Sequence, residues 1–242
     1  MTQLDRSRLG HLTFSAPGHG GDWSRWARRW PWGGQGKGAW TIGDDGSLCA
    51  YAPSQVTTQK GVLCLTARPS EAKDGDAAWD MPYVSGLISS FPFFKQTYGY
   101  FEVRAQFPRG RGLHPGIALY RNPNPAIEDE IDVIETIGDD TRGAFLTLHF
   151  GSGAKDYVSQ TARVFDAGAG MTTHGLLWTD KTISWFQNDQ LVASTPTHAA
   201  QHAPMSLIIN LGVGGNWAGA PDPRAFPARL LVEGVKAYAL KA

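Results

Sequence analysis

The stretch AIEDEIDVIETIG, residues 126–138, sets carboxylates into a run that is otherwise apolar and β-branched. The apolar residues predict a strand buried on one face, and a buried carboxylate is costly unless it is paired. Residues two apart in a strand share a face, so Glu128, Glu130 and Asp132 are expected to point the same way. An acidic face of this kind calls for a functional explanation.

Glu135 breaks the alternation. It lies five residues after Glu130, so a regular strand would direct it to the opposite face. One extra residue at Val133–Ile134, a β-bulge, would restore Glu135 to the acidic face and would return Ile137 to the core. We therefore interpret E-x-D-x-x-E as three carboxylates on one face, with a bulge between the second and the third.

Carboxyl groups that share a face suit the hydrolysis of a glycosidic bond. Hydrolysis with retention needs two carboxyls about 5–5.5 Å apart, one as nucleophile and one as acid/base. Regular spacing leaves Glu130 and Glu135 farther apart, so inward-leaning side chains must close the gap. Asp132 between them is expected to raise the proton affinity of the neighbour that acts as acid. Two alternatives stay open on spacing alone, an aggregation-deterring edge strand and a calcium site.

The rest of the chain is a succession of short strands and turns. From about residue 40, segments rich in Val, Ile, Leu and aromatic residues alternate with turns such as DDG (44–46) and NDQ (188–190). No segment of useful length shows helical periodicity. The pattern predicts an all-β sandwich or barrel, in one domain spanning residues 1–242.

Residues 1–40 are expected to be irregular and to pack on this domain. They contain WSRWARRWPWGG, residues 23–34. Its aromatic residues have three explanations: a basic binding patch, a sugar-stacking surface, or tryptophans that cover the end of the sandwich. We favour the last.

Charge and composition exclude several classes of function. Lys plus Arg and Asp plus Glu each number 22, so the formal net charge is zero and no global field attracts nucleic acid or an anionic membrane. No apolar run is long enough to span a bilayer, and the N-terminus has no signal-peptide core. We expect recognition in a local groove, and an extracellular or periplasmic location if an export signal lies outside this sequence.

The two cysteines, Cys49 and Cys64, both fall in predicted strands. We expect buried apolar residues rather than a disulfide, because buried free cysteine is common. No CxxC or HExxH spacing is present, so we expect no zinc site.

The segment YGYFEVRAQF, residues 98–107, has one polar face that carries Tyr100, Glu102 and Arg104. This face has two interpretations, an ordinary solvated surface or a groove for a hydroxyl-rich ligand.

Together these motifs resemble glycoside hydrolase family 16, the laminarinase, lichenase and agarase group. EIDVIE fits the family's bulged signature, E-[IL]-D-x-x-E. Further segments match in order and spacing: YVSGLISS…YGYFEVRAQFPRGRGLHPGIAL, TLHFG, HGLLWTDKTISWF and PMSLIINLGVGGNWAG. The resemblance covers roughly residues 80–220, and more loosely residue 40 to the end.

The resemblance implies a β-jelly roll of two antiparallel sheets, with a concave cleft for endo-acting hydrolysis with retention. By position, Glu130 would be the nucleophile, Glu135 the acid/base and Asp132 the carboxylate that assists. Further residues would line the cleft and bind substrate: Glu102, Arg104, His149, Asn210 and Trp217, with His114 in place of a tryptophan. No cofactor is required for the chemistry, and the family allows a structural Ca²⁺ on the convex face.

This chain departs from the family at residues 112–120. Where members usually carry GLWPAFWLL it has GLHPGIALY, so His114 and Ala118 replace two sugar-stacking tryptophans. The usual DG of a late hairpin is here Asn188-Asp189. We therefore hypothesise a wider or more polar subsite for a substituted or anionic polymer, with counter-charges drawn from Arg104, Arg109, Arg111 or Arg121.

We expect a monomeric endo-glycanase that cleaves a β-linked polysaccharide by double displacement, with no nucleic-acid or membrane partner. Two alternatives share the fold. A lectin-like binding module would have no need of three repelling carboxylates, whereas a transglycosylase would use the same residues. The sequence names neither the polymer nor the linkage.

Overall fold

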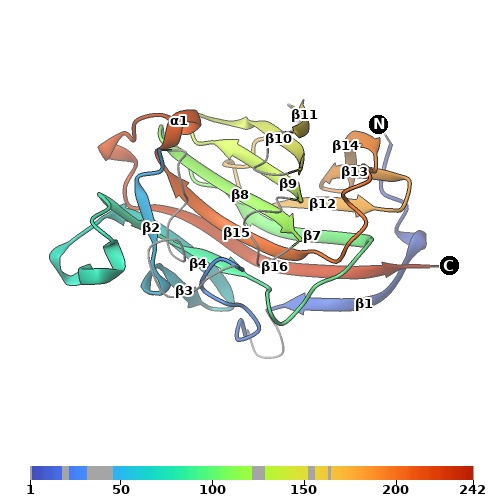
Figure 1. Ribbon diagram of the computed structural model, residues 1–242, viewed down its shortest axis with the longest axis horizontal. Helices are drawn as coiled ribbons and strands as arrows, with labels where there is room; N and C mark the ends of the chain where they lie inside the picture. Colours follow the sequence, from blue (N-terminus) through green and yellow to red (C-terminus); the bar gives the residue numbers. More distant parts are fainter. Residues whose placement is uncertain are drawn as a thin grey trace.

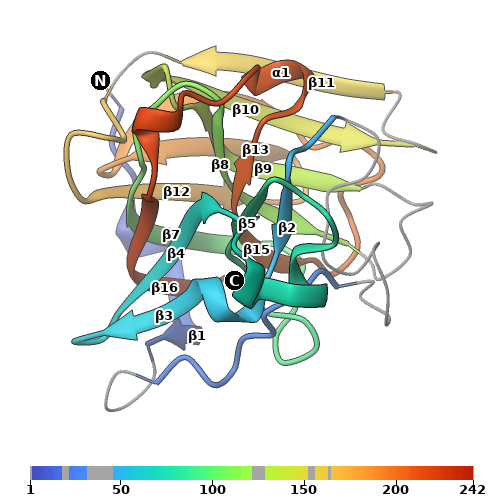
Figure 2. The ribbon, with the colours of Figure 1, turned by 90° about the vertical axis from the view of Figure 1, so that its left-hand side faces the viewer.

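The computed structural model describes residues 2–17, 22–31, 46–121, 129–151, 156–162 and 165–241. Strands dominate it, and they form two sheets that lie face to face (Figures 1 and 2). The helical elements in the described residues are short: η1 (Arg6–Arg8), η3 (Pro53–Gln55), η4 (Ala72–Ala78), α1 (Gly215–Ala218) and η5 (Pro223–Ala225). No helix in the described ranges is long and apolar enough to cross a bilayer.

The larger sheet has ten strands in the described part of the chain. Its order is β14 (Gln190–Pro196), β13 (Thr182–Gln187), β12 (Thr172–Trp178), β7 (Gly99–Gln106), β16 (Ala228–Leu240), β4 (Val62–Pro69), β5 (Tyr83–Ser85) and β2 (Cys49–Tyr51), while β1 (Leu9–Ala16) pairs with β16 and β3 (Val56–Gln59) with β4. The pairs are antiparallel except β2 and β5, which run parallel.

The smaller sheet has six described strands, all paired antiparallel. Its order is β11 (Asp156–Ala162), β10 (Asp140–Phe150), β9 (Glu130–Ile137), β8 (Leu113–Tyr120), β15 (Ser206–Val213) and β6 (Leu87–Ser89). The acidic strand β9 therefore lies inside this sheet, with a neighbour on each side.

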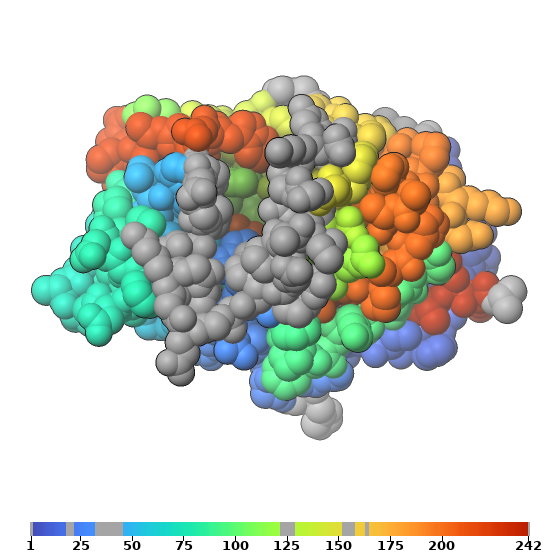
Figure 3. All heavy atoms as spheres, viewed as in Figure 1, coloured from blue at the N-terminus to red at the C-terminus, as the bar shows by residue number. Residues whose placement is uncertain are grey.

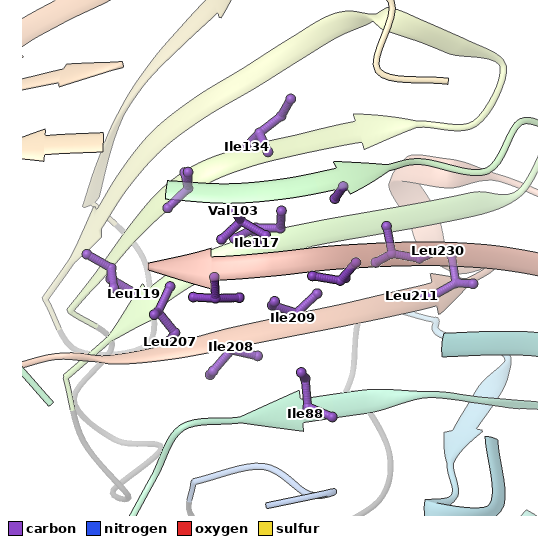
Figure 4. Packing of buried hydrophobic residues seen from close by; sticks show 14 of the residues in the cluster. Ile88, Val103, Ile117, Leu119, Ile134, Leu207, Ile208, Ile209, Leu211 and Leu230 are labelled. Atoms are coloured by element: carbon purple, nitrogen blue, oxygen red, sulfur yellow. The ribbon is translucent and has the colours of Figure 1, made fainter. Parts of the chain in front are cut away.

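The core fills the space between the two sheets (Figure 4). Alternate residues of each strand enter it, for example Phe101 and Val103 of β7 and Ile117 and Leu119 of β8, all of them fully buried. Burying one such side chain contributes about 1.5–3 kcal/mol. The predicted all-β sandwich is confirmed, and its architecture is that of a β-jelly roll.

The predicted succession of short strands and turns is present from Cys49 to Leu240, but residues 1–40 are not irregular throughout. Residues 9–16 form β1, which pairs with β16. The pairing has register shifts on both sides of Leu12, so Leu12 is exposed while Phe14 is buried. The expectation of an irregular segment was wrong here, and the alternation L-T-F-S-A of residues 12–16 was a signal for this strand.

The tryptophans after β1 cover the core, as expected. Trp26 is buried against Phe14, with ring centroids 5.7 Å apart, and Trp30 meets the edge of Tyr51 at 5.6 Å. Trp23 donates its indole N–H to the Gly61 carbonyl at 2.9 Å. Residues 32–34 of this cluster lie outside the described ranges, as does most of the DDG turn.

The late hairpin joins β13 to β14 through Asn188 and Asp189, whose φ angles of 48° and 64° fit the predicted two-residue turn. Asp189 also accepts two hydrogen bonds from Arg6, both at 2.8 Å. The aspartate at the second turn position thus anchors the N-terminal segment. Cys49 and Cys64 form no disulfide, as predicted; Cys49 is buried as expected, whereas Cys64 is only half-buried.

Candidate active site

The acidic strand β9 carries the predicted bulge. Ile134 faces Ile117 and Asp132 faces Ala118 on β8, so Val133 has no partner on that strand. Val133 and Ile134 are both buried in the core. Two consecutive inward residues invert the alternation, and Glu135 returns to the face of Asp132.

The strand after the bulge differs from the prediction at Ile137. Alternation resumes at Glu135, so Thr136 is the fully buried residue and Ile137 is only half-buried. The placement of Ile137 in the core was wrong because the period of two applies from Glu135 onward. Glu128, predicted on the acidic face, lies outside the described residues.

The three carboxyls meet on the outer face of the smaller sheet. The Asp132 side chain hydrogen-bonds to both Glu130 and Glu135. Asp132 is buried, whereas Glu130 and Glu135 are half-buried and reach solvent. The Asp132 carboxyl therefore lies between the two glutamates and is hydrogen-bonded to each of them.

Two histidines complete the cluster. His149 on β10 lies with Nε2 3.1 Å from Asp132 Oδ2, and His114 on β8 lies with Nε2 2.8 Å from Glu135 Oε1. Gly116, which faces Glu135 across β8 and β9, leaves room beside the pair. A Cβ at Gly116 would lie 3.2 Å from Asn210 Oδ1 and 3.7 Å from Glu135 Cγ.

The surroundings shift the pKa values of Asp132 and Glu135 in opposite directions. Burial raises the pKa of Asp132 well above its usual range, and the neighbouring Glu135 raises it further. Burial also acts to raise the pKa of Glu135, but the His114 hydrogen bond and charge, together with His149 and Asp132, bring it below its usual value. Asp132 thus does not raise the pKa of the adjacent acid as expected, because its hydrogen bond helps to lower the pKa of Glu135, and the raised pKa is that of Asp132.

A pocket of about 500 Å³ opens beside Glu135. Its lining includes both histidines, and the complete set is His114, Glu135, Phe145, Thr147, His149, Ser159 and residues 214–218. The segment around α1 forms an orange-red ridge along the upper edge of the face in Figure 3. Aromatic and hydroxyl groups around a carboxylate suit a sugar ring, which has apolar faces and polar edges.

Trp217 on α1 is the exposed aromatic of this pocket, with 44% of its surface accessible. Its ring meets His114 and Phe145 edge-on, each at a centroid distance of 4.7 Å. These two contacts fix the indole and leave much of it open to a ligand. Asn210 on β15 faces Gly116 on the neighbouring strand β8, and its Nδ2 donates to Tyr51 Oη at 3.0 Å. Asn210 is not among the described residues that line the pocket.

Glu102 and Arg104 are not brought to this site. Both lie on β7 of the larger sheet, on the face turned away from the core, where Glu102 pairs with Arg6 and Arg104 with Glu233. Their inward neighbours Phe101 and Val103 fill the core instead. The expectation that Glu102 and Arg104 line the cleft is corrected, because β7 and β9 belong to different sheets and their polar faces point in opposite directions.

None of the arginines suggested as counter-charges is among the described residues that line the pocket. Arg109 pairs with Asp166 at 2.7 Å, and Arg121 pairs with Asp129 just before β9. The described residues that line the pocket include no lysine and no arginine.

Sequence reasoning missed Phe145, Thr147 and Ser159. The signal for the first two was present, because alternation along AFLTLHF places Phe145 and Thr147 on the face of His149. Ser159 lies on β11, where it pairs with Thr147, and β11 was not predicted as a strand.

Glu130, Asp132 and His149 are the described residues whose ligand-type atoms come close enough to hold a cation, all within 4.8 Å of one another. The hydrogen bonds of Asp132 to Glu130 and to His149 already hold these three side chains together, so their proximity does not require a bound cation.

The fold and the bulged acidic strand beside an aromatic pocket define the jelly-roll class of glycoside hydrolases. The family model of the glycosyl hydrolases family 16 matches residues 44–226. An endo-1,3-1,4-beta-glycanase of Rhizobium meliloti, ExsH, is 34% identical over 77% of this chain and 40% of its own length. A second one from that organism, EglC, is 33% identical over 87% of this chain and 47% of its own length.

Among solved structures, the laminarinase from Rhodothermus marinus superposes with a TM-score of 0.77 at 25% identity, over 97% of this chain and 98% of that one. The chain belongs to the glycosyl hydrolases family 16. It spans less than half the length of the two curated Rhizobium relatives.

Proposed function

We propose that this protein cleaves a β-linked polysaccharide within the chain, with retention of configuration at the cleaved linkage. The observation that carries the proposal is the bulge at Val133, which turns Glu130 and Glu135 to one face with Asp132 hydrogen-bonded between them. A retaining mechanism needs two carboxyls on the same face of the cleft, one as nucleophile and one as acid/base.

In the first step, Glu130 attacks the anomeric carbon and forms a glycosyl-enzyme ester. The glycosidic C–O bond breaks as Glu135 gives its proton to the departing sugar oxygen. In the second step, Glu135 takes a proton from a water molecule that attacks the same carbon, and Glu130 leaves as a carboxylate.

Asp132 supports both steps through its position. Its side chain is hydrogen-bonded to two carboxyls whose charges change in opposite directions during the reaction. Because Asp132 keeps its own proton while Glu130 forms the ester, Glu135 stays the carboxylate that takes a proton from water in the second step. His149, at 3.1 Å from Asp132, fixes that side chain from the other side.

The substrate class follows from the pocket. The relatives named above act on 1,3-1,4-β-glycans or laminarin by their names, so we propose a β-glucan type of backbone. Gly116 and Ala118 are small residues on the outer face of β8, beside Glu135 and Asp132 respectively. They leave space for a substituted polymer. Because neither lysine nor arginine is among the described lining residues, we favour neutral substituents over anionic ones.

The test is the release of reducing ends from linear, branched, acylated and anionic β-glycans, with Glu130→Gln beside the wild type. Exposed Glu71 offers a matched control, because Glu71→Gln makes the same chemical change far from the pocket. We expect cleavage of at least one polymer by the wild type and Glu71→Gln, with a loss of at least about 10³-fold for Glu130→Gln. Binding of a glycan without cleavage would favour the lectin-like alternative, and elongated products would favour transglycosylation.

A further inference from the structure

His114 makes a contact that a sugar-stacking residue does not make. Its Nε2 lies 2.8 Å from Glu135 Oε1, within hydrogen-bond distance. The two side chains are about equally sheltered, with 19% and 20% of their surfaces exposed. A tryptophan at this position, as in the family pattern, would offer an indole N–H donor but no group that can carry a positive charge.

The imidazole is held on several sides. Its ring meets Trp217 edge-on, with an interplanar angle of 83°. Its backbone pairs with Gly212 on β15, and Gly116 two residues later on β8 leaves the space beside Glu135 open. These contacts keep the ring fixed with Nε2 directed at Oε1.

The charged groups around this pair come from two strands. Glu130, Asp132 and Glu135 lie on β9, and His149 lies on β10, where it contacts Asp132. Residues 214–218 and the facing Gly212 on β15 carry no ionisable side chain. His114 is therefore a cation-forming group within hydrogen-bond distance of Glu135, and the charge of His149 also acts on Glu135.

We propose that His114 is the positioning residue of the acid/base. It fixes Oε1 of Glu135 so that the other oxygen faces the substrate, and it determines the pH range over which Glu135 keeps the proton it must donate. This inference rests on the proposed role of Glu135. A donor or a positive charge next to a carboxylate favours the ionised form, so His114 makes Glu135 release its proton at lower pH.

The direction in which the pH profile of kcat/KM shifts tests the proposal. The basic limb of the kcat/KM profile reports the loss of the acid's proton, so removal of His114 moves that limb to higher pH. His114→Gln keeps a neutral N–H donor, and His114→Phe keeps a ring without donor or charge. We expect an upward shift for both variants, larger for Phe than for Gln. Normalised profiles of the three proteins that superpose would overturn the proposal.

A second readout does not depend on turnover. With ¹³C-labelled glutamate, the Glu135 carboxyl is assigned as the resonance missing from Glu135→Gln, and its titration midpoint is followed by NMR. The midpoint is expected to rise in His114→Phe, and to rise less in His149→Gln, because His149 lowers the pKa of Glu135 less than His114 does. An unchanged midpoint in His114→Phe would refute the role of His114. If no polymer is cleaved at all, the proposed function fails, while this titration still decides the inference about His114.

Discussion

Trp185 donates its indole N–H to the backbone carbonyl of Asp132 at 2.7 Å. Trp185 belongs to β13 of the larger sheet and is almost fully buried, whereas Asp132 belongs to β9 of the smaller one. This hydrogen bond crosses the core and reaches the residue next to the bulge. The geometry of the acidic strand is therefore held from the opposite layer.

The first prediction concerns this bond. Trp185→Phe removes the donor and leaves a buried carbonyl unpaired, which is expected to cost about 1–3 kcal/mol of the free energy of unfolding, besides the cavity. Because the bulge at Val133 loses its tether, kcat/KM on the cleaved polymer should fall as well. Urea unfolding and steady-state kinetics measure the two effects.

Trp178 supplies the matched control. It is also fully buried and donates its indole N–H to a backbone carbonyl, that of Gln201 at 3.0 Å. Trp178→Phe should destabilise the fold to a similar degree with a smaller loss of kcat/KM. Equal losses of activity at equal stability would show that the bond to Asp132 has no special role.

The second prediction concerns the buried Asp132. Asp132→Asn keeps the shape but removes the ionisable group, so activity should fall about 10-fold or more. The stability of the folded variant should instead exceed that of the wild type at neutral pH. A carboxyl whose pKa is raised in the folded state contributes stability at low pH, and that contribution is lost as pH rises through the folded pKa.

The Asn variant has no such loss. Its melting temperature should therefore equal or trail that of the wild type in acid and exceed it at neutral pH, with a difference that grows as pH rises. Thermal unfolding from acidic to mildly alkaline pH checks this trend. A difference that shrinks with rising pH would mean that Asp132 is ionised in the folded protein.

The third prediction concerns β1. Phe14 is buried, with its ring stacked on Phe94 at 4.5 Å, whereas Leu12 on the same strand is exposed. Phe14→Ala should cost about 3–5 kcal/mol of the free energy of unfolding. Leu12→Ala should cost within about 0.5 kcal/mol. Similar costs at both positions would contradict the observed register between β1 and β16.

Much of the fold was accessible from alternation and turns, because most strands are regular over the stretches that face the core. The bulge at Val133 could be predicted because one extra residue is needed to bring Glu135 to the same face as Asp132. Strand β1 was missed although Leu12, Phe14 and Ala16 alternate with polar residues, because this pattern covers only five residues. Alternation also shows which residues share a face, but not which sheet the strand joins.

Glu102 and Arg104 were placed in the cleft wrongly because alternation does not show which sheet a strand joins. Their strand has a polar face like that of β9, yet it lies in the other sheet. The contact between His114 and Glu135 was likewise invisible, since it joins residues on two strands whose register only the folded structure defines.

The fourth prediction concerns Trp217. Its exposed indole is expected to stack on a sugar ring, so Trp217→Ala should weaken substrate affinity about 10-fold, with a smaller effect on kcat. Phe93 is similarly exposed, and it lies outside the pocket. Phe93→Ala should leave both constants unchanged, as measured by initial rates over a range of polymer concentrations. An equal KM for the wild type and Trp217→Ala would remove this residue from the binding surface.

The central claim is double displacement at Glu130, and the anomeric configuration of the first product tests it most directly. A polymer that the protein cleaves is digested inside an NMR spectrometer, and the new reducing end is observed before mutarotation. The account predicts that the β-anomer appears first and the α-anomer grows later. Initial release of the α-anomer would show a single inverting displacement, and Glu130 would then not be a nucleophile.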